Sequence, residues 1–211
     1  MNNPIFTQVV TSLLKAEVIC AVKDRVAFDY LRVESNKSEV QTYLKALGRD
    51  VRSTSTQDAF ICCYTNINDP QVKASSQEQF KIAAKEFQPL VEWLCLVMDC
   101  NPTGTPIRAG DIIAKGEILE RIEQSQVLYS RLAHLAGNRV FGSRSQDAVG
   151  QLQQILAKLV EWGYFISFGH AGTRYQATGR WSVLYDQLGF IRTYEALDED
   201  FENEATQDSL I

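Results

Sequence analysis

The chain has 211 residues, of which 45% are hydrophobic, 10% aromatic and 22% charged. This length allows one large domain or two small ones with a buried core, and the composition is typical of a soluble globular protein. No apolar run approaches the roughly 20 residues of a membrane-spanning helix, and residues 1–10 lack the pattern of a signal peptide, so we expect a cytoplasmic protein.

The net charge of −5 is unevenly distributed along the chain. Residues 195–208 contain seven acids and no base, so residues 1–194 alone carry +2. Segment 126–194 contains seven bases and only three acids. High like charge with few apolar side chains predicts that residues 195–211 form an acidic, disordered tail behind this basic region.

The first 65 residues are predicted to contain helices followed by a hairpin. Pro4 suits an early helical position, Asn36 or Ser38 is a candidate cap for a later helix, and Gly48 ends that helix. In chain order, the predicted elements are a helix over 4–15, an apolar run over 18–22, helices over 24–33 and from 36 or 38 to 47, and strands over 50–53 and 59–64.

A polar connector containing Pro70 separates these elements from a second set. Ser75 and Glu78 have capping-box spacing and begin a long helix to about Asp99, which Pro89 is expected to kink. Two short helices are predicted over 115–123 and 126–135, the second capped by Ser125.

Residues 151–175 carry the clearest pattern. Leucines and isoleucines at three- and four-residue spacing predict an amphipathic helix, which Ser143 or Ser145 is expected to cap. Gly163 suits the left-handed position after a helix. An alternating strand over 164–168, a glycine-rich tip and a second strand follow.

Helices followed by a hairpin therefore occur twice in the chain. This order predicts a mainly helical α+β protein of two tandem winged-helix domains with β-hairpin wings. The predicted divisions are a first domain over 1–68, a connector over 69–75, a second domain over 76–194 and the acidic tail over 195–211.

Motifs for catalysis or metal binding are scarce. The two histidines, His134 and His170, stand in no metal-ligand spacing, and the five cysteines form no CxxC pair. P-loop and GxSxG motifs are absent from the sequence. We therefore expect no enzyme, no metal, no cofactor and no small-molecule substrate.

DNA binding and protein binding remain as alternatives. In a winged helix the second helix of the turn enters the major groove, and the wing touches the adjacent backbone. The candidate phosphate contacts are Arg144, Lys158, Arg174 and Arg180. Glu161 opposes binding near the end of that helix. Trp93, Trp162 and Trp181 are candidate anchors for a protein partner, although core packing is the commoner role of tryptophan.

The chain resembles the MukE/MksE family, the tandem winged-helix accessory subunits of bacterial condensin-like SMC complexes. The similarity lies in the helix end at 159–163, the aromatic strand before Gly169-His170, and the pair Arg174-Tyr175. Segments 27–31, 40–44 and 58–60 and the acidic tail are also similar. Relatives can carry consecutive arginines just before the helix-ending glycine, where this chain has Val160 and Glu161.

The resemblance implies a non-catalytic, nucleoid-associated homodimer. It would bind a kleisin subunit (MukF/MksF-like) and through it an SMC ATPase (MukB/MksB-like), for chromosome organisation and segregation or for plasmid defence. It also implies non-specific contacts to double-stranded DNA from Lys158, His170 and Arg174. The alternative is a winged-helix transcriptional regulator that binds a specific operator.

Overall fold

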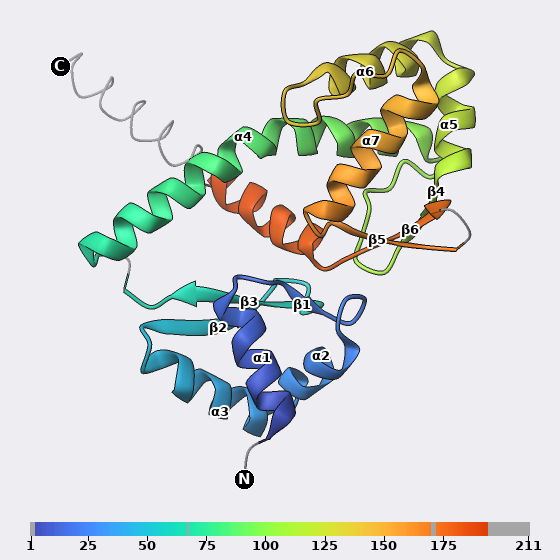
Figure 1. Cartoon of the computed structure of the whole chain (residues 1–211). Coiled ribbons are helices and arrows are strands. Elements are labelled where there is room, and N and C mark those ends of the chain that lie inside the picture. The colour runs from blue at the N-terminus through green and yellow to red at the C-terminus, as the bar shows by residue number, and fades with distance from the viewer. Residues whose placement is uncertain (1–2, 67, 170–171, 194–211) are drawn as a thin grey trace, which may run out of the picture.

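The structure is a computed structural model that describes residues 3–66, 68–169 and 172–193 (Figure 1). Across these residues the protein is mainly helical α+β, with two three-stranded antiparallel sheets, which confirms the predicted fold class at that level. His170 and the predicted tail over 195–211 lie outside the described residues. None of the helices in the described part is long and apolar enough to cross a membrane.

The first half of the chain combines three helices with one sheet. Its elements are α1 (Pro4–Leu14), β1 (Ile19–Cys20), α2 (Arg25–Arg32), α3 (Glu34–Lys45), β2 (Arg49–Ser53) and β3 (Ala59–Tyr64). β3 lies in the middle of the sheet, between β1 and β2. α3 begins at Glu34 without a side-chain cap, and Asn36 lies inside it, donating to the Tyr30 carbonyl at 3.2 Å. The predicted cap at Asn36 or Ser38 is therefore wrong.

The second half begins with a long helix and holds the second sheet. Its elements are α4 (Pro70–Cys100), β4 (Ile112–Ala114), α5 (Lys115–Glu123), α6 (Gln126–Gly137), α7 (Ala148–Glu161), β5 (Phe165–Phe168) and β6 (Arg174–Ala177), followed by a helix over residues 180–193. The bounds of α5 and the Ser125 cap of α6 are as predicted. α4 begins at Pro70 rather than at Ser75, so residues 70–75 of the predicted connector are helical.

The end of α7 follows the predicted pattern, but its start does not. Gly163 has a φ of 78°, and the amides of Gly163 and Tyr164 donate to the carbonyls of Val160 and Leu159. These two bonds satisfy the last carbonyls of the helix. At the other end, the cap is Asp147, whose carboxylate accepts from the Gly150 amide, and not Ser143 or Ser145.

Buried apolar side chains form two clusters, one drawn from residues 9–60 and the other from residues 90–184. In the second cluster, the centre of the Trp181 ring lies 4.6 Å from the ring centre of Tyr164 and 5.5 Å from that of Phe165. Trp93 and Trp181 are both fully buried, and Trp162 is half-buried. Trp93 and Trp181 are therefore core side chains rather than exposed anchors for a partner.

The two halves meet where the helix over 180–193 begins. Asp58, in the loop between β2 and β3, accepts a 2.7 Å hydrogen bond from the Ser182 hydroxyl. Asp186 accepts from the Ser55 amide at 3.0 Å and from the Ser55 hydroxyl. The hairpin loop of the first half is thus hydrogen-bonded to the last helix of the second.

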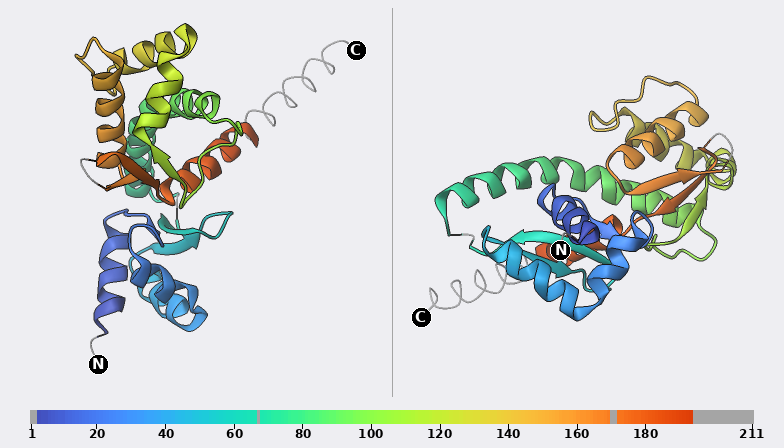
Figure 2. Two further views of the ribbon diagram at one scale, coloured as in Figure 1. Left: turned by 90° about the vertical axis from the view of Figure 1, so that its right-hand side faces the viewer. Right: turned by 60° about the horizontal axis from the view of Figure 1, so that its bottom comes forward.

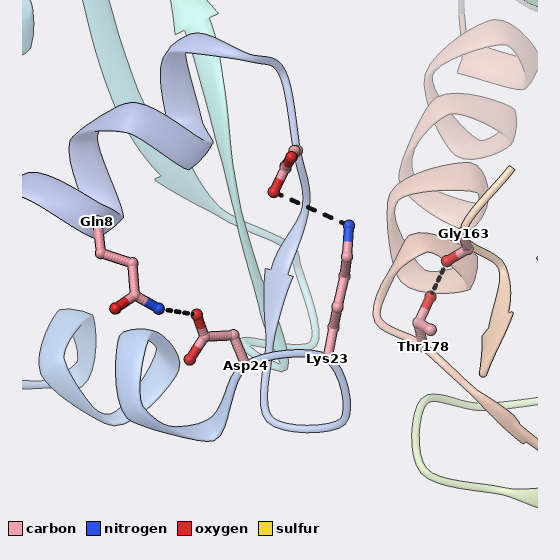
Figure 3. A network of polar contacts seen from close by, with 6 residues as sticks. Gln8, Lys23, Asp24, Gly163 and Thr178 are labelled. Carbon is pink, nitrogen blue, oxygen red and sulfur yellow. Dashed lines mark hydrogen bonds and ion pairs between the residues drawn. The ribbon is translucent and has the colours of Figure 1, made fainter. Parts of the chain in front are cut away.

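Backbone packing at this junction is equally close. A Cβ atom placed on Gly179 would lie 2.6 Å from the Cβ of Ala59 and 2.8 Å from that of Cys20. Figure 3 shows the turn after β1, with Lys23, beside the segment in which the Thr178 hydroxyl donates to the Gly163 carbonyl at 2.6 Å. Only glycine fits at position 179 without moving one half away from the other.

Replacing Gly179 by alanine tests this contact. We expect Gly179→Ala to lower the free energy of unfolding by about 1–3 kcal/mol, as overpacking usually does. Gly189→Ala, in the helix that begins just after Gly179, is the control, because a Cβ there meets nothing within 4 Å. The control should raise stability by about 0.5–1 kcal/mol. Urea denaturation measures both, and equal effects of the two changes would contradict the close contact.

Candidate nucleic-acid interface

The hairpin after α7 brings a basic side chain to its outer end. Arg174 begins β6, where it pairs with Phe168 of β5 on one side and Ala114 of β4 on the other. Its side chain is exposed. Both neighbouring strands run antiparallel to β6, which holds the arginine at a defined place on the sheet.

Lys115 connects this end of the hairpin to the middle of α7. Its amide donates to the Thr173 carbonyl at 3.0 Å, next to Arg174, and its Nζ donates to Oε1 of Gln153 at 2.8 Å. The lysine was not among the predicted contacts. It precedes the basic segment 126–194, and only the pairing of β4 with β6 brings it beside the hairpin.

Two exposed arginines lie in the segment that leads into α7. Arg139 and Arg144 both stand between α6 and α7, and Arg144 comes four residues before the first residue of the helix. Figure 2 (left) shows α7, this segment and the hairpin β5–β6 along one side of the second half. We call Lys115, Arg139, Arg144 and Arg174 the basic face.

The cations of the basic face are free of acidic partners in the part of the chain that the structure describes. The ion pairs found there involve other bases, namely Lys23, Arg25, Lys37, Arg131 and Lys158. Cationic side chains without acidic neighbours retain their full charge toward an approaching phosphate. The face is therefore electrostatically suited to an anionic polymer.

Lys158, a predicted contact, has an acidic partner. Its Nζ lies 2.8 Å and 3.0 Å from the two carboxylate oxygens of Glu161 and 5.6 Å from the centre of the Trp162 ring. Lys158 and Glu161 are the only charged residues of α7, so the helix has no net charge. The cation of Lys158 is thus neutralised locally before any phosphate approaches.

Arg180, also predicted, lies apart from the basic face. Its guanidinium carbon is 5.3 Å from the centre of the Tyr164 ring. It lines a groove of about 630 Å³ between the two halves, with Ile61 and Cys62 from β3 and Phe87 from α4. In the structure, Arg144 and Arg174 are therefore exposed at the surface along α7. Lys158 instead pairs with Glu161, and Arg180 lies beside the Tyr164 ring.

Glu86 of α4 lies in the same groove as Arg180. Burial raises the pKa of the Glu86 carboxyl above its ordinary value, although the nearby Arg180 and Lys158 cations act in the opposite direction. Desolvation therefore outweighs the attraction of two cations at this site.

The N-terminus of α7 carries a negative charge of its own. The Ser145 hydroxyl and the Gly150 amide hold the pKa of the Asp147 carboxyl below its ordinary value, so the cap stays ionised. A carboxylate there satisfies the helix dipole and opposes a phosphate at the same place. Val149, 43% exposed, follows in the first turn. These residues make the tip of α7 a poor anion site, unlike the basic face around it.

The remaining chemistry is sparse. Among the described residues, no three His, Cys, Asp or Glu side chains are grouped so that they could hold a metal ion.

No protein-family model matches the chain, and no curated protein matches it in sequence.

The raised pKa of Glu86 leads to a pH prediction. Between the ordinary pKa of a glutamate and the raised pKa, the folded state binds the proton more tightly than the unfolded state does. The free energy of unfolding should therefore fall as pH rises through that window. We expect Glu86→Gln to remove this fall, measured by urea denaturation from pH 4 to 7. Glu123→Gln, at an exposed site on α5, controls for the loss of one acid and should keep it.

Proposed function

We propose that the chain is a tandem winged-helix protein whose second half contacts double-stranded DNA without sequence preference. Each half runs helix, strand, further helices and hairpin, and each sheet has its first strand paired with its last. This is the order of elements in a winged helix. The second half differs by one additional helix before its hairpin, since α5, α6 and α7 stand where the first half has α2 and α3, and by the helix over 180–193 after it.

The observation that carries the DNA assignment is the basic face beside α7. Arg174 and Lys115 occupy the wing side of the helix and Arg144 its other end, while α7 itself is uncharged overall. Phosphate contacts position a protein on DNA, whereas base contacts specify a sequence. A face with cations beside a helix that has no net charge and an acidic cap favours the first kind of contact.

The resemblance to the MukE/MksE family gives this binding a biological setting. We infer a non-catalytic, nucleoid-associated accessory subunit that dimerises, binds a kleisin and through it an SMC ATPase, and acts in chromosome segregation or plasmid defence. The first half supports a partner-binding role, because it exposes large apolar side chains. Those on its helices and their ends are Leu14, Val26, Val33, Tyr43 and Leu47.

Salt dependence separates this proposal from a regulator that binds a specific operator. For three or four phosphate contacts, raising the salt from 50 to 200 mM should weaken binding by about 40- to 150-fold on any duplex. A regulator would instead lose about 1–3 kcal/mol for each mismatched base pair in one site. Fluorescence anisotropy with random and genomic duplexes measures both, and a strong preference for one sequence would overturn the proposal.

The basic face can be tested by charge reversal. We expect Arg144→Glu with Arg174→Glu to weaken binding of a random duplex by at least about tenfold and to lower the salt slope by about 2. Arg32→Glu with Arg52→Glu, at exposed positions of the first half, is the matched control and should change affinity much less. Equal effects of the two pairs would remove the basic face from the interface.

The apolar surface of the first half has its own test. Tyr43 is 49% exposed and Leu47 51% exposed, at the end of α3 and just after it. We expect Tyr43→Glu with Leu47→Glu to prevent capture of the kleisin-like protein encoded in the same genome, and to leave the duplex affinity unchanged. Co-purification and anisotropy measure these outcomes. Undiminished capture would place the partner elsewhere.

A further inference from the structure

The chain carries a strongly acidic segment and an exposed basic face without acidic partners in the described residues. We propose that residues 195–208 occupy the basic face of the same chain and compete with nucleic acid for it. This inference rests on the proposed function, since it concerns regulation of the same surface. It assigns the segment a role as an internal competitor for phosphate-binding side chains.

Charge complementarity is the first argument. Residues 195–208 contain seven acids and no base, and the basic face offers Lys115 together with three exposed arginines, Arg139, Arg144 and Arg174. Carboxylates interact with the same guanidinium and ammonium groups as phosphates do.

Reach is the second argument. The helix over residues 180–193 has 14 residues, so it is about 21 Å long. The six steps from Arg174 to Arg180 span at most about 20 Å. The end of the helix therefore lies no farther than about 40 Å from Arg174. From Thr193 the chain can span about 30 Å to Glu202, about 36 Å to Glu204 and about 50 Å to Asp208, so the last acids of the segment can reach the basic face.

Tethering makes weak contacts effective. A linked segment acts at a local concentration of the order of millimolar. If it occupies the face for about nine-tenths of the time, the apparent affinity for DNA falls about tenfold, because only the free fraction binds. Salt screens this competition as it screens DNA binding, since the Debye length at 0.1 M salt is about 10 Å.

Neutralising the acids in the full-length chain tests the competition. We expect replacement of all seven acids by Asn or Gln to tighten binding of a random duplex by about tenfold at 50–100 mM salt. A smaller pair of variants controls for net charge. Glu202→Gln with Glu204→Gln and Asp208→Asn, the acids with the longest reach, should tighten binding clearly more than the triple change Asp29→Asn, Glu34→Gln and Glu39→Gln, at exposed sites of the first half. Equal gains from the two triple variants would overturn the inference.

Zero-length cross-linking tests the contact directly. A carbodiimide joins carboxylates to amines that touch them, and Lys115 is the lysine of the basic face. We expect cross-links between residues 195–208 and Lys115 within one chain, lost when duplex is added. Cross-links only to other lysines, or only between isotopically distinct copies, would overturn the inference.

The two proposals fail in different ways. If duplex binds through Arg174 but neutralising the acids has no effect beyond the control, the proposed function stands and the competition is refuted. If the cross-link to Lys115 forms but neither version of the chain binds duplex, the contact stands and the DNA-binding function is refuted.

Discussion

The close contact at Gly179 determines how the two halves of the molecule are arranged. No side chain fits between this residue and the Cβ atoms of Cys20 and Ala59, and the hydrogen bonds that Asp58 and Asp186 accept also join the two halves. The loop between β2 and β3 is therefore packed against the last helix. In a winged helix this loop is the tip of the wing. On our proposal, two units of similar architecture divide their roles, because the first hairpin is packed against the other half, whereas Arg174 on the second hairpin is exposed.

Much of this architecture could be predicted from periodicity and capping. The α7 stripe, the turn at Gly163 and the bounds of α5 each depend on residues that are neighbours in sequence, so local spacing was sufficient. β1 and β4 have two and three residues, which is too short for alternation to distinguish them from a loop. Their existence depends on pairing with β3 and β6, residues far away in the chain. The Asp147 cap was missed because Ser143 and Ser145 compete with it on local preference alone.

The candidate site was predictable only in part, for a similar reason. The exposure of Arg144 and Arg174 could be predicted, because Arg144 stands just before a helix and Arg174 stands on a hairpin. The partner of Lys158 is three residues away, at Glu161, and helical spacing alone could have indicated that pair. Arg180 is different, because Tyr164 and Glu86 reach it from separate elements. Lys115 is part of the basic face because β4 pairs with β6 and because its Nζ donates to Gln153. Both partners are far away in the sequence, so no local pattern could predict this position.

The distribution of charge around α7 also constrains how DNA could be bound. A helix that reads bases in the major groove needs hydrogen-bonding side chains at its tip, and here the tip carries the ionised Asp147 and the apolar Val149. Bringing that carboxylate close to phosphates costs free energy, whereas Arg174 and Lys115 lower the free energy of the same approach from the wing side. The two effects together favour a complex in which the wing and the segment before α7 contact the DNA backbone. The tip of α7 would then stay away from the base edges in the major groove. Affinity would then depend on salt much more than on sequence, because phosphate contacts carry no sequence information.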